Sequence, residues 1–317
     1  MTVGNRSHET LIILNGAGSG IDAARSDGYR KQRRTVCQGL LGFWFLLGVK
    51  GGDLAAQSND QPFPPHRIVG NVYYVGSESL ASYLITTSAG HILINSSFEE
   101  TVPLIQASVE QLKFRFQDVK ILLTSHAHSD HVAGNALVKR LTGARVLVMK
   151  GDENLVRTGG KGDFQYESVW EPCPVDEVLR DGQEVKLGDT VLVAHRTPGH
   201  TKGCTTWTLR VSEGGKLHHV VIIGSPNVNP GYRLVGNSKY PTISDDFART
   251  FQILKSLPCD VFLGAHGNYY GMQEKYAQLQ KGAAGNPFID PQGYRQYVAL
   301  KKKAFQDELA RQEKAGR

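Results

Sequence analysis

The sequence predicts an α/β fold in which two β-sheets face each other and carry helices on their outer faces. Strand-like and helix-like segments alternate along the first half of the chain, and the second half repeats this order. Sheets covered by helices on one face bury their other faces against each other. No linker or internal repeat divides the 317 residues beyond the N-terminal part, so one folded domain is expected there.

The elements are expected in the following order. Apolar runs predict strands at 67–75, 81–87, 91–96, 119–124 and 145–149, with helices at 99–113 and 132–141. In the second half, strands are expected near Val191, Thr205, Val220 and Val261, and helices at 245–257, 272–281 and 291–315. Segment 152–171 is polar and glycine-rich without periodicity. It is either a loop over a site or an ordinary surface connection.

The N-terminal part has the order of a secretory signal. A basic cluster at 30–34 precedes an apolar run at 36–49 and small residues at 51–56. The apolar run is short for a membrane span. Because residues 1–29 precede this signal, we interpret the true start as lying downstream of Met1, and a tolerated extension is the alternative. Residues 1–56 are therefore expected to be an extension and signal peptide, and 57–317 a domain exported to the periplasm without a membrane anchor.

The charge balance excludes a nucleic-acid partner. The whole chain carries +6, but residues 1–56 hold seven Lys or Arg and four Asp or Glu, so 29 minus 26, or +3, remains for the rest. No basic patch with interleaved aromatic residues is present. Cys173, Cys204 and Cys259 permit at most one disulfide in the exported domain. A monomer is expected.

The segment after the fourth expected strand is rich in metal-ligating side chains. Residues 124–131 read Thr-Ser-His-Ala-His-Ser-Asp-His. His126 and His128 are two apart in extended chain and point to the same side, whereas Asp130 and His131 follow where the chain turns into a helix. Zinc prefers this ligand set. The segment is therefore predicted to serve two metal ions, and the alternative is a polar loop that is rich in histidine.

Two further histidines follow expected strands in the same way. His200 lies on a Thr-Pro-Gly-His-Thr turn, and His266 lies in Gly-Ala-His-Gly after a short apolar run. Alone, either is as readily a loop histidine without a role, but next to the first motif a ligand role is favoured. Structural or surface positions are expected for His66, His91, His195, His218 and His219.

The motifs His-x-His-x-Asp-His, Pro-Gly-His-Thr and Gly-Ala-His-Gly, in this order, resemble the metallo-β-lactamase superfamily over roughly residues 67–315. The chain is most similar to the third subclass of class B β-lactamases, through His-Thr-Lys-Gly-Cys-Thr-Thr-Trp at 200–207, Ser-Pro-Asn-Val-Asn-Pro-Gly-Tyr at 225–232 and Leu-Pro-Cys-Asp-Val at 257–261. The resemblance implies an αββα four-layer sandwich with the active site at one edge of the two sheets.

The resemblance also implies a ligand set for two zinc ions. His126, His128 and His200 would bind the first ion. Asp130, His131 and His266 would bind the second. All six positions carry the residues that this subclass requires.

One strand end separates the third subclass from its relatives. Residues 222–225 read Ile-Ile-Gly-Ser, where glyoxalase II and lactonases of the superfamily place a metal-bridging aspartate and other β-lactamase subclasses place a metal-binding cysteine nearby. A serine hydroxyl is a poor zinc ligand. The resemblance implies instead that Ser225 and Asn227 bind the substrate carboxylate, although both also suit a plain turn. Tyr232 is implied to face the site and polarise the lactam carbonyl; the alternative is an amphipathic tyrosine at the rim of a core.

The function implied is hydrolysis of the β-lactam ring of penicillins, cephalosporins and carbapenems, which confers antibiotic resistance. Two zinc ions generate the attacking hydroxide, and Asp130 orients it. A hydrolase of a lactone or thioester, such as glyoxalase II, is the first alternative, and Ser225 argues against it. A non-catalytic zinc protein is the second. Structural zinc sites usually have four protein ligands, so three ligands per ion favour an enzyme.

Overall fold

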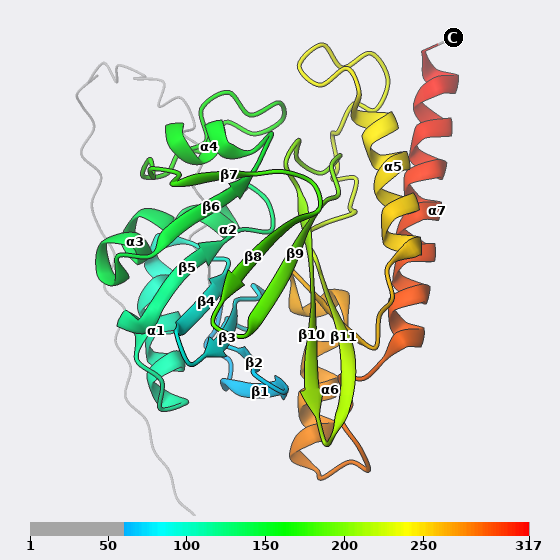
Figure 1. The fold of residues 1–317 in the computed structure, drawn as a ribbon. Helices are drawn as coiled ribbons and strands as arrows, with labels where there is room; N and C mark the ends of the chain where they lie inside the picture. Colours follow the sequence, from blue (N-terminus) through cyan, green and yellow to red (C-terminus); the bar gives the residue numbers. More distant parts are fainter. Residues whose placement is uncertain (1–59, 317) are drawn as a thin grey trace, which may run out of the picture. The chain divides into compact units, whose positions relative to one another are not determined.

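The computed structural model describes residues 60–316. The predicted extension, the signal peptide and their boundary at residue 56 lie outside the described residues. Two sheets pack face to face within the described part, and each carries helices on its outer side (Figure 1). This arrangement confirms the predicted αββα sandwich. None of the helices among residues 60–316 is long and apolar enough to cross a membrane.

The first sheet has seven strands, which lie side by side in chain order. Its first three pairings are antiparallel and the last three are parallel. The strands are β1 (His66–Val69), β2 (Val72–Tyr74), β3 (Tyr83–Thr87), β4 (Gly90–Ile94), β5 (Val119–Leu123), β6 (Arg145–Met149) and β7 (Glu177–Leu179). The segments between its parallel strands form η1 (Glu99–Thr101), α1 (Val102–Gln111), η2 (Phe116–Asp118), α2 (Ser129–Val132), α3 (Asn135–Thr142) and α4 (Glu153–Thr158).

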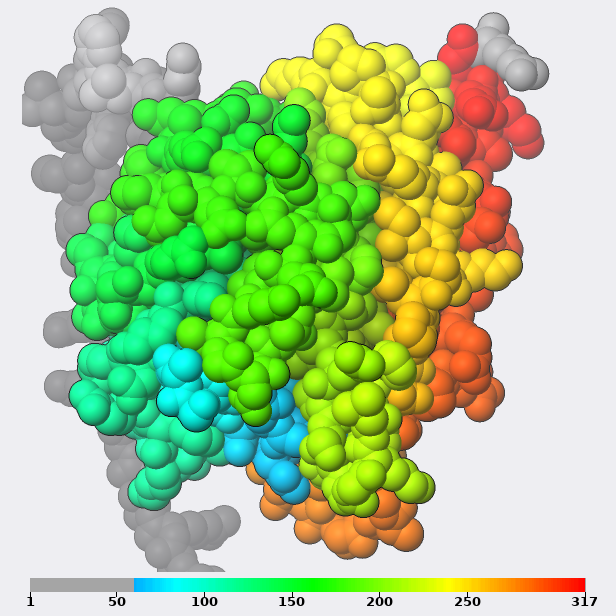
Figure 2. Space-filling view, viewed as in Figure 1, coloured from blue at the N-terminus to red at the C-terminus, as the bar shows by residue number. Residues whose placement is uncertain are grey.

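The second sheet has five strands in the order β12-β11-β10-β9-β8. Only β11 and β12 pair in parallel. The strands are β8 (Gln183–Leu187), β9 (Thr190–Arg196), β10 (Thr205–Glu213), β11 (Lys216–Ile223) and β12 (Val261–Gly264). The helices of this half are α5 (Ile243–Ser256), η3 (Gly267–Tyr269), α6 (Met272–Gln280) and α7 (Pro291–Ala315). In the space-filling view the yellow segment lies against the green one, and the red C-terminal segment lies beyond the yellow one (Figure 2).

Several predicted elements differ from those observed. The expected strand at 67–75 is a hairpin, because the chain turns between Val69 and Val72 and β1 pairs with β2. The expected helix at 132–141 is two helices, α2 and α3, separated at Ala133 and Gly134. The sequence reasoning did not identify β7, β8 or α4. The last helix is confirmed at both ends, from Pro291 to Ala315.

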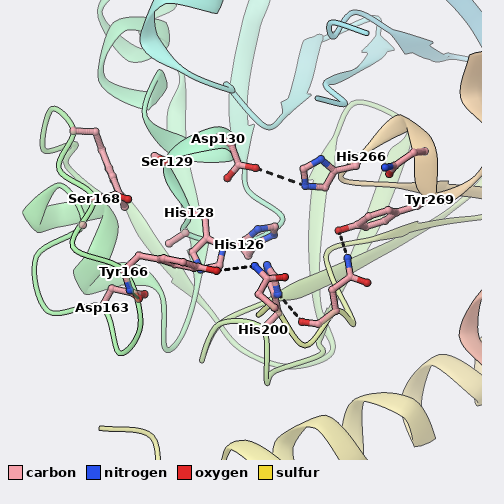
Figure 3. A pocket seen from close by; sticks show the side chains of 16 residues that line it. His126, His128, Ser129, Asp130, Asp163, Tyr166, Ser168, His200, His266 and Tyr269 are labelled. Carbon is pink, nitrogen blue, oxygen red and sulfur yellow. Dashed lines mark hydrogen bonds and ion pairs between the residues drawn. The ribbon is translucent and has the colours of Figure 1, made fainter. Parts of the chain in front are cut away.

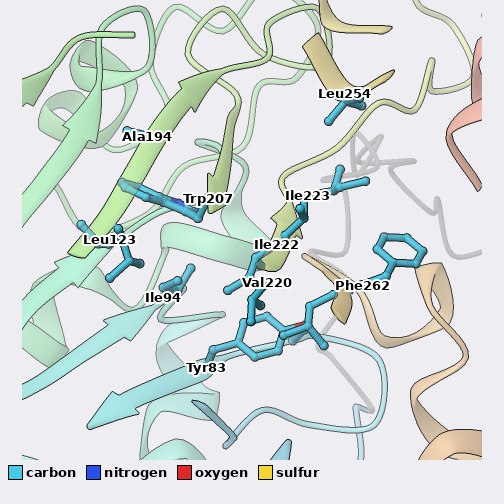
Figure 4. Close-up of a cluster of buried hydrophobic side chains, with 14 of the residues drawn as sticks. Tyr83, Ile94, Leu123, Ala194, Trp207, Val220, Ile222, Ile223, Leu254 and Phe262 are labelled. Carbon is cyan, nitrogen blue, oxygen red and sulfur yellow. The ribbon is translucent and has the colours of Figure 1, made fainter. Parts of the chain in front are cut away.

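Successive side chains along the parallel strands point to opposite faces of the sheet and so enter two separate apolar layers. In β5, Ile121 and Leu123 face the core between the sheets, whereas Leu122 packs under α1 and α3. A period of two is what a strand buried on both faces requires. Side chains of both sheets, including Ile94 and Val220, fill the central core (Figure 4).

Trp207 of β10 joins this core to the loop that carries the first histidines. Its side chain is fully buried, and its Nε1–H donates to the carbonyl of Thr124 across the sheets at 3.0 Å. The bond satisfies both polar groups in an apolar setting. Trp207 therefore fixes the end of β5 at the point where the metal-ligating residues begin.

We predict that Trp207→Phe lowers the free energy of unfolding by about 1–3 kcal/mol, because it leaves the buried Thr124 carbonyl unpaired. Urea denaturation followed by circular dichroism measures this change. Trp170→Phe is the matched control, since the indole nitrogen of Trp170 has no partner among the described residues. Equal losses for the two variants would contradict the role of the bond.

Candidate metal centre

Strand ends from both sheets meet at one edge of the sandwich. The loops that follow β5, β6, β9, β11 and β12 all contribute side chains there. A pocket of about 490 Å³ opens between them (Figure 3). Its size is that of a small-molecule site. The pocket is lined by His126, Ala127, His128, Ser129, Asp130, Gly160, Asp163, Tyr166, Ser168, Trp170, His200, Asn227, Asn229, His266, Asn268 and Tyr269.

The structure brings the first three predicted ligands together. One ring nitrogen each of His126, His128 and His200 lies within 4.8 Å of the other two. His200 donates its Nδ1–H to the carbonyl of Asn227 at 2.8 Å. This bond fixes the tautomer, so that Nε2 of His200 is left as a free lone pair for a metal.

The second predicted trio is equally compact. Nε2 of His131 lies 3.2 Å from Oδ2 of Asp130 and 3.2 Å from Nε2 of His266. The distance from His266 Nε2 to the same carboxylate oxygen is 3.6 Å. Figure 3 shows Asp130 and His266 facing each other across the pocket mouth. The two trios adjoin, since His126 also groups with Asp130 and His131.

Burial and mutual repulsion keep the imidazoles of His126, His128 and His266 neutral. Burial first, and the neighbouring histidines second, hold the pKa of His126 well below its usual value. Burial likewise lowers the pKa of His128 and His266 to about 4. Burial alone would raise the pKa of Asp130, but His131 and His266 hold it well below its usual value. Neutral imidazoles beside a carboxylate are the protonation states that metal ligation needs.

The donor set fits a metal ion. Nε2 of His128 is buried and has no hydrogen-bond partner among the described residues, and native proteins rarely leave such an atom unpaired. Three nitrogens on one side and two nitrogens with a carboxylate on the other match the ligands of zinc. Three protein ligands per ion also leave a position open for water, as catalytic zinc sites do.

Asp152, at the loop after β6, ties two ligand-bearing loops together. Its side chain is 1% exposed, and its Oδ2 accepts from the Ala127 amide at 2.9 Å and the Thr201 hydroxyl at 2.6 Å. Oδ1 accepts from the Gly203 amide at 2.7 Å. Burial raises the pKa of Asp152 to about 6 against these bonds, so the carboxylate is ionised at neutral pH. It thereby fixes the segment between His126 and His128 relative to the loop of His200.

The sequence reasoning missed Asp152, although a signal was present. Like the ligands at 126–131, this residue follows a buried strand of the first sheet and lies beyond its C-terminal end. Parallel strands deliver their C-terminal loops to one edge. A carboxylate at this position was therefore a candidate for the same site.

The turn that carries His200 depends on a glycine. Gly199 has φ = +127°, and a Cβ there would lie 2.6 Å from the ring of Phe247. Only glycine combines that backbone conformation with that close approach. The Pro-Gly pair of the motif therefore sets the position of the histidine against α5.

Tyr232 lies behind His200 and outside the pocket lining. Its side chain is 2% exposed, and its hydroxyl donates to the carbonyl of His200 at 2.8 Å. Burial raises its pKa far above the usual value. This position differs from the expectation that the hydroxyl faces the substrate, since the proton is given to the backbone of the ligand loop. A direct part for Tyr232 in the reaction stays a prediction.

Ser225 and Asn227 occupy different depths. Asn227 lines the pocket, whereas Ser225 is 1% exposed and lies beneath Tyr269. The hydroxyl of Tyr269 accepts from Nδ2 of Asn227 at 2.7 Å and lies 3.2 Å from Oγ of Ser225. Sequence reasoning did not single out Tyr269, although it lies only three residues beyond His266. Carboxylate binding by Ser225 and Asn227 stays a prediction.

Segment 152–171 forms one wall of the pocket. Its Tyr166 ring packs edge-on against His128, with centroids 5.0 Å apart, and the Tyr166 hydroxyl accepts from Nδ2 of Asn229 at 2.8 Å. Oδ1 of Asp163 accepts from the amides of Gln165 and Tyr166 and so holds this turn. Of the two alternatives for the segment, the structure favours the loop over a site.

The other predicted roles agree with the structure where it describes them. Nε2 of His195 lies 2.8 Å from the hydroxyl of Thr208, away from the pocket, as a structural histidine would. Cys173, Cys204 and Cys259 are all free thiols, so none of the three pairs with another. Cys173 and Cys204 are buried, and Cys259 is half-buried.

Residues 78–211 match the sequence profile of the metallo-beta-lactamase superfamily. The native FEZ-1 metallo-beta-lactamase from Legionella gormanii is 50% identical, with a TM-score of 0.79 over 80% of this chain and 98% of that one. The chain belongs to the metallo-β-lactamase superfamily. Its structural neighbours are class B3 enzymes. BJP-1 of Bradyrhizobium japonicum, a subclass B3 metallo-beta-lactamase, is 38% identical, with a TM-score of 0.76 over 81% of this chain and 98% of that one.

Two more comparisons bear on metal content and substrate class. LRA-12 from an Alaskan soil metagenome, a class B3 di-zinc metallo-beta-lactamase, is 32% identical, with a TM-score of 0.74 over 78% of this chain and 94% of that one. A hydroxyacylglutathione hydrolase of Methylococcus capsulatus is 34% identical over 82 residues, which are 26% of each chain. The match therefore spans about a quarter of the length of this curated relative.

We predict that Asp152→Asn lowers zinc affinity about 10–100-fold, as loss of groups behind metal ligands commonly does. It should also lower the free energy of unfolding by about 1–3 kcal/mol. The side-chain nitrogen of the variant cannot accept a hydrogen bond, so at least one of the three donors that now bind Asp152 would lose its partner. Competition with a chromophoric chelator measures the first effect and urea denaturation the second. The neighbouring Glu153→Gln is the control and should leave zinc affinity unchanged. Lost stability with normal zinc affinity would limit Asp152 to folding.

Proposed function

We propose that this protein hydrolyses the β-lactam ring of penicillins, cephalosporins and carbapenems. The observation that carries the proposal is the pair of adjoining ligand trios in one open pocket, where a serine rather than a carboxylate lies at the end of β11. The β-lactamases FEZ-1 and BJP-1 support it, because the match to this chain covers nearly the whole length of each.

We propose two zinc ions as the cofactor, with His126, His128 and His200 as one ligand set and Asp130, His131 and His266 as the other. Zinc bound there supplies an acidified water and polarises a carbonyl oxygen. The chain's own residues do the rest. Asp130 holds Oδ2 toward the two histidines, and Oδ1 has no hydrogen-bond partner in the described part of the chain. That second oxygen is placed to accept a hydrogen bond from the attacking water and to take up its proton.

The pocket walls position the substrate. Tyr166 lies beside His128 and accepts from the side-chain amide of Asn229, and Asn227 also lines the pocket. Tyr232 and Asn227 hold His200 in place through its carbonyl and Nδ1–H. Such preorganisation lowers the barrier because the groups need not rearrange during the reaction.

The decisive experiment compares the hydrolysis of three substrates by one purified, zinc-loaded protein. We expect kcat/KM for benzylpenicillin and for a carbapenem to exceed kcat/KM for S-lactoylglutathione by at least about a hundredfold, since a pocket built for one reacting geometry discriminates strongly. Loss of ultraviolet absorbance measures all three reactions. A preference for the thioester would overturn the proposal in favour of a glyoxalase II activity, to which the curated relatives with partial matches point.

Elemental analysis is expected to find two zinc ions per chain in fully active protein. Chelation should abolish turnover, and it should also lower the melting temperature, because it leaves buried imidazoles without partners. Full activity with one zinc ion or none would contradict the two-ion assignment.

Asp130→Asn should lower kcat by about 10²–10⁴-fold, the usual value of a positioned proton acceptor. The fold should remain, as judged by circular dichroism. Asp163→Asn removes the other pocket carboxylate and is the control; its kcat should change far less. Normal turnover of Asp130→Asn with both ions bound would show that Asp130 has another role.

We further propose that the domain is exported to the periplasm by the signal at residues 30–56. The order of basic, apolar and small residues supports this proposal. N-terminal sequencing of protein from the periplasmic fraction should begin near residues 55–58, and a mature chain that starts at Met1 would refute it.

A further inference from the structure

Tyr269 is held rigidly at the wall of the pocket beside the second ligand trio. Its ring lies 5.1 Å from the ring of His266. On one side it packs on the bare backbone of Gly264, where a Cβ would lie 2.7 Å from the tyrosine ring. The ring of Tyr297 in α7 also stacks on the ring of Tyr269, with the ring centroids 5.2 Å apart and an angle of 30° between the ring planes. The sequence thus fixes the position of one hydroxyl at the pocket wall.

The neighbours of this hydroxyl leave its proton available. Nδ2 of Asn227 donates to the phenol oxygen at 2.7 Å, because an amide nitrogen can only donate. Ser225 Oγ lies 3.2 Å from the phenol oxygen and can also donate to it. The same Oγ accepts from the backbone amide of Asn227 at 3.4 Å. When both neighbours donate, the phenol oxygen has used its two lone pairs. Its own proton is then free for an acceptor, either the neighbouring Tyr297 hydroxyl or a group that enters the pocket.

The charge of the pocket defines that acceptor. Among the described residues that line it, none is a lysine or an arginine. A carboxylate that enters must therefore find neutral donors besides any metal. Ser225, at 1% exposure, is covered by Tyr269 and does not line the pocket, whereas Tyr269 does.

We propose that Tyr269 donates its hydroxyl proton to the carboxylate that β-lactams carry beside the ring nitrogen, and that Ser225 and Asn227 position this hydroxyl. The inference rests on the proposed function and adds a specificity-determining residue to it. It changes the role expected for Ser225 from direct contact with the substrate to support of the residue that makes the contact.

The test uses Tyr269→Phe, which removes the hydroxyl and keeps the ring against Gly264 and Tyr297. KM for benzylpenicillin should rise about 10–100-fold, the value of a lost hydrogen bond to a charged group, with kcat and zinc content little changed. For benzylpenicillin methyl ester, which lacks the charge, wild type and variant should have similar KM values. Tyr166→Phe is the matched control from the opposite wall, and any change that it causes in KM should be the same for the acid and the ester.

A binding measurement separates this role from turnover. Calorimetric titration of the zinc-loaded protein with benzylpenicilloate, the ring-opened product, should show at least tenfold weaker binding for Tyr269→Phe than for wild type. If wild type hydrolysed no β-lactam, the proposed function would fail, and this titration would still decide on Tyr269. Equal affinity for the product, or an equal rise in KM for acid and ester, would overturn the role.

Discussion

Hydrogen bonds at Ser125 join the two sheets directly before the first ligand, His126. The amide of Ser125 donates to Oδ1 of Asn95 in the first sheet at 2.8 Å, and its carbonyl accepts from the Thr205 amide of the second sheet at 2.7 Å. Both partners are buried. Buried backbone groups that exchange bonds between sheets fix their relative position more precisely than apolar packing does. His126 is the next residue, so the backbone position of the first ligand is fixed by the same hydrogen bonds.

Asp152 extends the same constraint to the next loop. It binds the backbone at Ala127 on one side and at Thr201 and Gly203 on the other. Six candidate ligands from three loops must lie within a few ångströms of one another before any metal arrives, and their imidazoles repel when protonated. An ionised carboxylate that accepts three donors offsets part of this cost, because charge-assisted bonds are the strong ones.

The sequence predicted the clustered histidines and Asp130 better than it predicted the walls of the pocket. His126, His128, His200, His131 and His266 all follow strands, and chemistry restricts their residue types, so the pattern carries both place and role. Tyr166 and Tyr269 line the pocket through loop geometry that no periodicity encodes. The depth of Ser225 was equally hidden, because it depends on which neighbour covers it. At the break of the expected helix, Gly134 lies close to α1, where a Cβ would lie 2.5 Å from Val102.

The end of β11 shows how one residue type steers substrate class. A carboxylate at Ser225 would be buried beside Tyr269 and Asn227, and its charge would disfavour an anionic substrate in a pocket without lysine or arginine lining. Serine, with Tyr269 and Asn227 above it, instead builds a neutral network of donors. Neutral donors bind a carboxylate without the desolvation cost of a buried cation. Under the proposed function, this network would receive the carboxylate that a β-lactam carries next to the bond that breaks.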